Sequence, residues 1–587
     1  MKIDIEKIKS QVDSAALRHY GPNFTFRPNQ KEAIVSIIYS WLTGTSKDII
    51  LEGPTGSGKS AIGMLVAAVL SEDYGKKGYI IISDLSLIQQ YERDIDKYFK
   101  SSDWAVLKGQ QNYYCDINGL LFSSGACKLK GCKTYKEIMS KFPECSNFCK
   151  YLKDRQAAIS SNVLVCTYSF WLIQQNVVKK VVDNPPFGSR DFLICDEAHK
   201  LVGIVQNHFS PTFSEGDLIK MRAVVENASP DDVSIIDELS RIREIVTFKD
   251  NNDVILDALK KYVEKGKIVS DSVDIIRRSL SEKVDNGETL GKDDRSLAYS
   301  CDFIEEHFNS ISEYTKIIDK VGVDSLVKNP SGNQIKFNCT DESYLMGKYF
   351  HSHCGLKLYM SATIGEPQAY AKDCAIKEYN SIKIPSTFDF TNSPIFYVDR
   401  YKLSYKEKDY SLPKIVDMIS FVSRMYGNQR GIIQTGSYEF AKKLFEMAPS
   451  DLKDRLILYD DSKGKDEAII IFKGKDNKIL VGPSLVEGLS FDDDLCRFQI
   501  IMKVPYPSLA DRFVKAKQTV NPEWYSNTTA ISILQGVGRG IRNEKDWCVT
   551  FIFDGCFTYL WQKSMNMFPD EFKRRIQIIQ PEQFGLN

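Results

Sequence analysis

Residues 48–60 carry the sequence DIILEGPTGSGKS, and this stretch decides the fold class. Its beginning, Asp48–Glu52, encloses an apolar run typical of a short buried strand, and residues 61–70 read as a helix. A glycine-rich loop between a strand and a helix is the arrangement that binds nucleotide phosphates, because its N–H groups and the helix N-terminus favour negative charge. We therefore expect an α/β fold with a phosphate-binding loop at residues 53–60.

Two residues of this loop have expected roles in binding ATP and its metal ion. Lys59 is expected to reach the β- and γ-phosphates of ATP, and the Ser60 hydroxyl is expected to coordinate Mg²⁺. An incidental glycine turn is the alternative, and the flanking strand and helix disfavour it. The predicted nucleotide-binding residues of the loop are Gly53, Pro54, Thr55, Gly56, Ser57, Gly58, Lys59 and Ser60.

A second apolar run, in the sequence FLICDEAH at residues 192–199, is followed by two acidic residues, Asp196 and Glu197. It predicts a buried parallel strand that delivers two carboxylates at its C-terminal end, where α/β sheets bind ligands. We expect Asp196 to hold the Mg²⁺ shell and Glu197 to orient and deprotonate the attacking water. His199 either couples this site to the next domain or packs beside it.

The length and composition of the chain limit the number of domains and the kinds of partner that it can have. A chain of 587 residues is too long for one core and predicts three or four domains. Lys+Arg and Asp+Glu balance at 77 each, so any surface for nucleic acid is local. No signal-peptide core and no apolar stretch of ~18 residues is present, which predicts an intracellular protein with no membrane partner.

Five of the fourteen cysteines fall within residues 115–149. In a reducing compartment, clustered cysteines more often hold metal than form disulfides. On spacing alone, tetrahedral zinc and a [4Fe–4S] cube fit equally well, since both take four thiolates. A second candidate, the HSHC sequence at residues 351–354, has no further cluster nearby, which favours packing over a metal role. The five clustered cysteines are Cys115, Cys127, Cys132, Cys145 and Cys149.

Further motifs occur in an order that resembles superfamily 2 helicases. RPNQ at residues 27–30 is similar to the family's adenine-reading segment, with Gln30 as its base-contacting residue. SAT at residues 361–363 is similar to the motif that links hydrolysis to domain movement. QGVGRGIR at residues 535–542 resembles the arginine-finger helix. The resemblance implies that Arg539 and Arg542 approach the γ-phosphate across a domain cleft and that Gln535 senses this phosphate. The expected catalytic residues are then Lys59, Asp196, Glu197, Gln535, Arg539 and Arg542.

A closer resemblance is to the XPD/DinG family of iron–sulphur DNA helicases. It rests on LKGQQNYYC at 107–115, CKYLKDR at 149–155, VEGLSF at 486–491 and VPYPS at 504–508. The family's entry to and exit from its cluster domain imply that Cys115 and Cys149 are the first and last ligands of a [4Fe–4S] cluster. By the same resemblance, the metal ligands are Cys115, Cys127, Cys132 and Cys149, with Cys145 as the spare cysteine.

The resemblance also implies the domain organisation. The fold class is α/β, with two RecA-like parallel-sheet motor domains, the first of which carries an iron–sulphur insertion and a mainly helical Arch insertion. Apolar spacing at residues 273–284 and 300–321 predicts helices in the second insertion, with loops at 285–294 and 329–334. The expected segments are motor domain 1 at 1–108, 157–205 and 344–386, the cluster domain at 109–156, the Arch domain at 206–343 and motor domain 2 at 387–587.

The implied activity is ATP-dependent translocation on single-stranded DNA, with 5′→3′ direction, and unwinding of forked duplex DNA. ATP, Mg²⁺ and a [4Fe–4S] cluster are the expected cofactors. The expected protein is a monomer, cytoplasmic or, in a eukaryote, nuclear. DNA repair, transcription, replication restart and a viral programme are all open as its biological role. An RNA helicase or a nucleoprotein-remodelling ATPase is one alternative, which the cysteine segment disfavours. A non-enzymatic, ATP-gated and redox-sensing DNA-binding module is another, which Glu197 and Arg539 disfavour.

Aromatic residues around the cysteines suggest how bases are held. Stacking contributes ~1–3 kcal/mol per base and tolerates any sequence. For each ring on its own, core packing is the alternative and the commoner outcome. The candidate rings are Tyr113, Tyr114, Phe122, Tyr135 and Tyr151.

Overall fold

The structure is a computed structural model of the whole chain. It describes residues 3–54, 56–100, 103–130, 132, 135–178, 187–459, 464–483, 491, 493–541 and 546–585. Within these residues, no helix combines the length and the apolar character that a membrane crossing requires. Thr55, Arg542 and most of the segment 486–491 lie outside the described residues.

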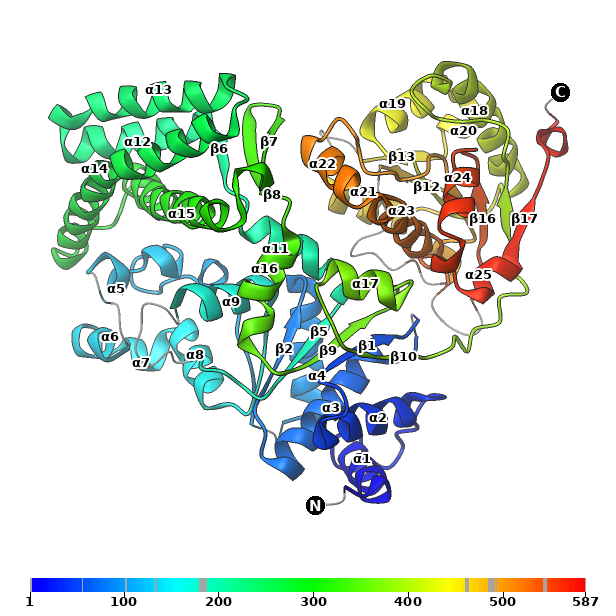
Figure 1. Cartoon of the computed structure of the whole chain (residues 1–587), viewed down its shortest axis with the longest axis horizontal. Coiled ribbons are helices and arrows are strands. Elements are labelled where there is room, and N and C mark those ends of the chain that lie inside the picture. Colours follow the sequence, from blue (N-terminus) through cyan, green and yellow to red (C-terminus); the bar gives the residue numbers. More distant parts are fainter. Residues whose placement is uncertain are drawn as a thin grey trace.

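The first sheet has seven parallel strands in the order β10-β1-β9-β5-β2-β4-β3 (Figure 1). The strands predicted at Asp48–Glu52 and at Phe192–Asp196 are confirmed as β1 and β5. Their near-continuous apolar runs follow from helices that cover both faces of the sheet. The remaining strands are β2 (Gly78–Ile82), β3 (Trp104–Val106), β4 (Val163–Thr167), β9 (Leu356–Ser361) and β10 (Asn380–Lys383).

Strand order places the motifs next to one another. β10, β1, β9 and β5 are neighbours, and the chain leaves them at the same edge of the sheet. The phosphate loop, SAT and the two carboxylates are therefore adjacent. The helix predicted at 61–70 is confirmed within α3 (Lys59–Tyr74), which is buried along most of its length. The other helices of this part are α1 (Ile5–Tyr20), α2 (Gln30–Thr43), α4 (Leu85–Tyr98), α9 (Tyr168–Ile173), α11 (Leu201–His208), α16 (Glu342–Tyr349) and α17 (Pro367–Asp373).

The cysteine-bearing segment has short helices and no strand among its described residues. Its apolar residues join the same core as those of the second insertion. Because the elements are this short, their own hydrogen bonds stabilise them little, and packing must hold them in place. The helices are α5 (Ala126–Leu129), α6 (Tyr135–Lys141), α7 (Cys145–Phe148) and α8 (Lys150–Ser160).

The second insertion is mainly helical, as expected, but it also contains a small antiparallel sheet in the order β6-β8-β7. The loop predicted at 329–334 is wrong: these residues form the end of β7 (Leu326–Ser331), a tight turn, and the start of β8 (Gln334–Cys339). Gly332, with φ of 56°, supplies the left-handed conformation that this turn requires. The other elements are β6 (Thr212–Ser214), α12 (Glu215–Ala228), α13 (Ser234–Phe248), α14 (Asn252–Asp285) and α15 (Lys292–Val321).

The second large sheet also has seven parallel strands, in the order β13-β14-β12-β15-β16-β11-β17. A linker without regular structure, at residues 384–394, joins β10 to it. The strands are β11 (Ile395–Tyr397), β12 (Gly431–Gln434), β13 (Leu456–Leu458), β14 (Ile479–Gly482), β15 (Phe498–Ile501), β16 (Val549–Ile552) and β17 (Ile576–Ile578). The principal helices are α18 (Lys408–Met425), α19 (Tyr438–Met447), α21 (Lys465–Lys473), α22 (Arg512–Val520), α23 (Pro522–Val537), α24 (Phe557–Lys563) and α25 (Asp570–Arg575).

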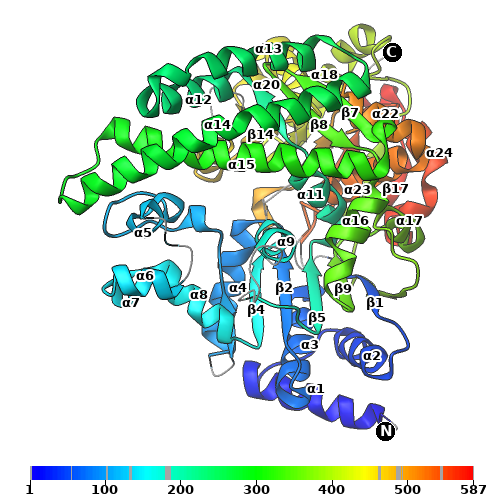
Figure 2. The same cartoon turned by 60° about the vertical axis from the view of Figure 1, so that its left-hand side comes forward.

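The second insertion touches the cysteine-bearing segment. Figure 2 shows the long helices α14 and α15 reaching over α5. Ser124 donates a hydrogen bond to the carboxylate of Asp302 at 2.5 Å, and Lys130 pairs with Asp285. Arg277 binds both Asp302 and Glu305 and so holds in place the Asp302 carboxylate that accepts the hydrogen bond from Ser124. The cysteine-bearing segment is therefore braced by polar contacts as well as by the shared core.

The same insertion also contacts the second sheet's helices at its other end. The Asn329 side chain donates to the Asp511 carboxylate at 2.9 Å and accepts the backbone N–H of Arg512 at 3.1 Å. It thereby satisfies an N–H of the first turn of α22, which no intrahelical partner can satisfy. Nearby, Lys517 on α22 and Glu342 on α16 form a largely buried ion pair at 2.7 Å. Both contacts hold α22 against the first half of the molecule.

Candidate nucleotide site and cysteine cluster

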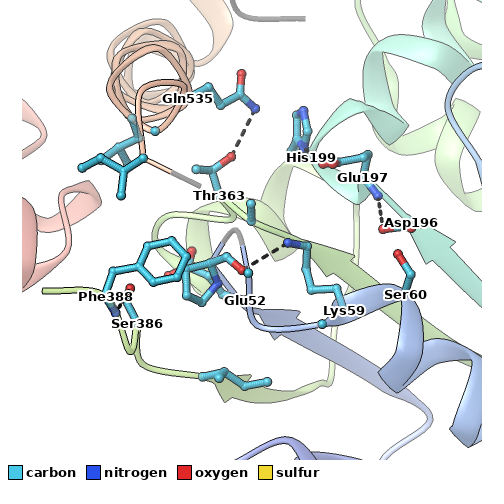
Figure 3. A pocket seen from close by; sticks show the side chains of 18 of the residues that line it. Glu52, Lys59, Ser60, Asp196, Glu197, His199, Thr363, Ser386, Phe388 and Gln535 are labelled. Atoms are coloured by element: carbon cyan, nitrogen blue, oxygen red, sulfur yellow. Dashed lines mark hydrogen bonds and ion pairs between the residues drawn. The ribbon is translucent and has the colours of Figure 1, made fainter. Parts of the chain in front are cut away.

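A cavity of about 700 Å³ lies between the two large sheets. Its lining includes the phosphate loop and both carboxylates on one side and the end of α23 on the other (Figure 3). The structure brings together Gly56, Gly58, Lys59, Ser60, Asp196, Glu197, Gln535 and Arg539 in this lining. The residues on the two sides of the cavity, up to Glu197 and from Gln535 onward, lie far apart in the sequence, so the fold creates the site.

The phosphate loop is held by side chains on both flanks. Lys59 Nζ donates to the carbonyl of Gly53 at 2.8 Å. Gln30 is almost fully buried; its amide donates to the carbonyl of Gly58 at 3.2 Å and accepts the N–H of Arg27 at 3.1 Å. The structure thus places Gln30 against the loop. Gly53, Pro54 and Ser57 belong to the same loop, and Ser57 is buried.

Asp196 ends β5 and is fixed from two directions. Its carboxylate accepts the hydroxyl of Tyr91 at 2.9 Å and the backbone N–H of Glu197 at 3.0 Å. Glu197 has a φ of 53°, a left-handed conformation that is costly for a residue with a side chain. This turn of the backbone lets the two adjacent carboxylates lie on the cavity together rather than on opposite faces of a strand.

The two carboxylates have different proton affinities. Burial raises the pKa of Asp196 to about 6, and the neighbouring charge of Glu197 adds to the rise while Lys59 opposes it. Burial also acts to raise the pKa of Glu197, but the hydrogen bond with His199 and the charges of His199, Lys59 and Lys200 together outweigh it and hold this pKa low, at about 2. Glu197 is therefore ionised at neutral pH, the state that a general base requires.

A chain of contacts leads from these carboxylates across the cleft. His199 Nδ1 lies 3.3 Å from a carboxylate oxygen of Glu197 and 2.8 Å from the hydroxyl of Ser361. The Ser361 hydroxyl accepts the N–H of Thr363 at 3.2 Å. The Thr363 hydroxyl in turn accepts the side-chain amide of Gln535 at 3.1 Å (Figure 3). His199 thus contacts both the carboxylate motif and SAT, and SAT contacts α23.

Of the two predicted arginine fingers, only Arg539 belongs to the residues that the structure describes. Arg539 follows α23 and lines the cavity. Arg542 and the loop residue Thr55 lie outside the described residues, so their placement stays a prediction.

Sequence reasoning missed several residues of the cavity. Tyr91 has no motif around it and is found only through its contact with Asp196. Phe388, on the linker, packs so closely on the loop that a Cβ added at Gly56 would lie 2.5 Å from its ring. Met567 lines the cavity from the second sheet's side. Glu52 directly precedes the loop, and a charged residue ending an otherwise apolar strand was a signal that could have found it.

All five clustered cysteines are described, and all are buried and free of disulfide bonds. They belong to one core. Burial raises the pKa of Cys127 to about 12, with smaller upward contributions from the nearby Cys115, Cys145 and Cys132. Burial raises the pKa of Cys145 to about 11, and Cys149 and Cys115 add to it. The thiols therefore lie close enough together to repel one another when ionised.

Among the described residues, however, no three His, Cys, Asp or Glu side chains converge on one metal position. A [4Fe–4S] cube takes one thiolate at each of four irons, so its ligands stand farther apart than those of a single zinc ion. The donor set of buried, unbridged thiols in one segment fits such a cube in number and chemistry. Which four of the five are ligands stays a prediction.

Most aromatic rings near the cysteines serve the core. Tyr113, Phe122 and Tyr151 are buried and pack on one another. Tyr114 is 66% exposed, and Phe148, which sequence reasoning missed, is 69% exposed. The side chain of Tyr135 lies outside the described residues.

The second candidate metal site is used for packing. His351 contacts the carbonyl of Cys374 at 2.7 Å, and His353 contacts the side-chain oxygen of Asn176 at 2.8 Å. The Cys354 thiol faces backbone carbonyls. This agrees with the packing interpretation of residues 351–354.

Comparisons with known proteins match both halves of the site. Residues 27–120 match the family described as DEAD/DEAH box helicase, and residues 425–575 match the family described as Helicase C-terminal domain. A probable ATP-dependent helicase of Methanocaldococcus jannaschii is 21% identical, over 87% of this chain and 89% of its own length. The ATP-dependent DNA helicase XPD of Sulfolobus acidocaldarius is 22% identical, over 88% of this chain and 94% of its own.

The fold agrees with these relatives. A solved structure titled XPD_Helicase superposes with a TM-score of 0.63 at 16% identity, covering 95% of this chain and all of that one. The ATP-dependent DNA helicase YoaA of Escherichia coli is 20% identical over 90% of this chain and 91% of its own length. The expected fold of two RecA-like parallel-sheet domains is thereby confirmed. Motifs, family matches and fold together support an XPD/DinG-like superfamily 2 helicase.

Proposed function

We propose that this protein is an ATP-dependent DNA helicase that moves 5′→3′ along single-stranded DNA and separates forked duplex, with a [4Fe–4S] cluster bracing the strand-separating region. The observation that carries the proposal is the cross-cleft hydrogen bond between Gln535 and Thr363. It joins the two large sheets at the nucleotide cavity, so a change in the nucleotide has a direct route to a change in domain arrangement.

The roles of the cavity residues follow from their positions. Lys59 and the loop N–H groups bind the phosphates, and Ser60 with Asp196 holds Mg²⁺. The low pKa of Glu197 keeps its carboxylate ionised, the form that can orient the attacking water and accept its proton. Arg539 lines the cavity from the side opposite the phosphate loop, as a residue that stabilises charge on the γ-phosphate must. By the family resemblance, Arg542 shares that role.

DNA is the proposed substrate because the full-length relatives named above include ATP-dependent DNA helicases. The exposed Tyr114 and Phe148 neighbour the predicted ligands Cys115 and Cys149 and offer rings on which bases of any sequence can stack. Direction and the cluster rest on the family resemblance and on the five buried thiols. The proposed ligands are Cys115, Cys127, Cys132 and Cys149, and the cluster would supply a rigid crosslink among segments too short to be rigid alone.

The test uses anaerobically purified full-length protein. We expect ATP hydrolysis to be stimulated by single-stranded DNA more than by RNA of the same length. We expect strand separation from a forked duplex with a 5′ tail and not from one with a 3′ tail. Greater stimulation by RNA would favour the RNA-helicase alternative. ATP binding without turnover in any nucleic acid would favour the non-enzymatic module and contradict the proposal.

A further inference from the structure

Glu52 lies where three parts of the nucleotide cleft meet. It is the last residue of β1 and directly precedes the phosphate loop. In the sheet it stands between Ser361 of β9 and Lys383 of β10. Its side chain is only 14% exposed, which is low for a carboxylate at the rim of a cavity.

Each oxygen of this carboxylate has a different partner. Oε2 accepts two backbone N–H groups, from Ile364 at 2.9 Å and from Gly365 at 2.7 Å. Oε1 pairs with the Nζ of Lys383, the last residue of β10, at 2.9 Å. Hydrogen bonds to an ionised acceptor are among the stronger ones, so the carboxylate fixes the backbone that follows SAT.

The backbone that Glu52 fixes, residues 363–366, touches the second motor domain. Thr363 accepts the hydrogen bond from Gln535. At Gly365, whose φ is 76°, an added Cβ would lie 2.3 Å from the Met567 methyl group. The two domains are therefore in direct contact at this glycine. The N–H of Glu366 faces Met567 Sδ at 3.3 Å. One carboxylate thus connects the phosphate loop to both contacts with the other domain.

We infer that Glu52 is a positioning residue that transmits the state of the phosphate loop to the 363–366 turn and so to the second motor domain. Glu52 lines the nucleotide cavity, and this role is carried by its bonds to the turn. When ATP reorders the loop beside it, Glu52 moves the turn with the loop, because the loop follows Glu52 directly in the backbone and the turn is bonded to its carboxylate. The inference deepens the proposed function and rests on it for its consequence, the coupling of ATP hydrolysis to strand separation.

Three variants separate the contacts. Glu52→Ala removes the acceptor for both N–H groups. Glu52→Gln keeps an oxygen acceptor of the same shape without the charge. Lys383→Met removes the ion pair alone and is the matched control. Closure of the cleft on binding a non-hydrolysable ATP analogue is read by energy transfer between fluorescent amino acids at the exposed positions Leu17 and Tyr405.

We expect Glu52→Ala to bind the analogue but to populate the closed state about tenfold less, since each lost bond to an ionised group is worth that much or more. Glu52→Gln should recover most of the closure, and Lys383→Met should close like the parent. The closure measurement needs no DNA. Failure of the inference therefore appears as unchanged closure in Glu52→Ala, whereas failure of the proposed function appears as absent DNA stimulation in the parent protein.

Two further outcomes would overturn the inference. One is a loss of analogue binding and of closure in equal proportion, which would show that Glu52 acts only on nucleotide binding by the phosphate loop. The other comes from a double-mutant cycle of Glu52→Ala with Met567→Ala, in which Glu52→Met replaces Glu52→Ala if that variant does not fold. Non-additive closure is expected because Glu52 acts through the turn that Met567 contacts, and additive effects would show that it does not.

Discussion

The hydrogen bond from Gln535 to Thr363 spans the cleft between the motor domains at 3.1 Å, and both side chains are half-buried. Removing it with Thr363→Val and Gln535→Ala should therefore slow ATP hydrolysis in a coupled way. A net contribution of ~0.5–1.5 kcal/mol is usual for a neutral hydrogen bond. If the bond acts in the closed state, the two variants should share a rate loss of about 2- to 13-fold, corresponding to that range.

The assay is a double-mutant cycle on the ATP turnover rate at saturating ATP and single-stranded DNA. The parent, the two single variants and the double variant give the coupling free energy directly. Ser532→Ala is the matched control, since its hydroxyl bonds the carbonyl of Thr528 within α23 at 3.0 Å and does not cross the cleft. We expect it to combine additively with Thr363→Val. A coupling between Gln535 and Thr363 no larger than this control would refute the cross-cleft role.

Three other predictions test separate parts of the molecule. Glu197→Gln should keep nucleotide affinity and lose ~10²–10⁴-fold in turnover, measured by steady-state hydrolysis and equilibrium binding, because the water loses its base; near-normal turnover would disprove that role. Cys115→Ser should lose iron and colour while Cys145→Ser keeps both, measured by iron analysis and visible absorbance of anaerobic protein; loss of iron on changing Cys145 would show that it is a ligand. Lys517→Met should lower the calorimetric unfolding temperature, since an unpaired buried Glu342 costs ~3–5 kcal/mol, and the double variant with Glu342→Leu should recover most of the loss; an unchanged temperature would mean that the pair is not buried in solution.

The parts of the site that could be predicted are those with local signals. The strand Asp48–Glu52 and the helix after the loop are written in consecutive residues, so their order identifies the loop. The same holds for β5, whose apolar run ends in two carboxylates. Once these strands are known to be parallel, their C-terminal ends must share an edge, and the site follows.

The parts that could not be predicted depend on distant contacts. Tyr91 bonds Asp196 across 105 residues of sequence, and no periodicity reports such a contact. Asn329 sits beside a proline and near a glycine, which are turn signals, yet it is buried in strand β7 and docks on α22. There, pairing with β8 and packing overrode local preference. The cysteines show a different limit, because spacing fixes neither the metal nor which four of five thiols bind it.

The central claim is that ATP hydrolysis in the cleft drives strand separation. The most direct measurement is displacement of a labelled strand from a 5′-tailed forked DNA duplex by anaerobically purified protein, recorded together with ATP consumed. We predict displacement with ATP, none with a non-hydrolysable analogue, and none by Glu197→Gln at any ATP concentration. ATP consumption that DNA stimulates without any strand displacement, or displacement that persists in Glu197→Gln, would contradict the account.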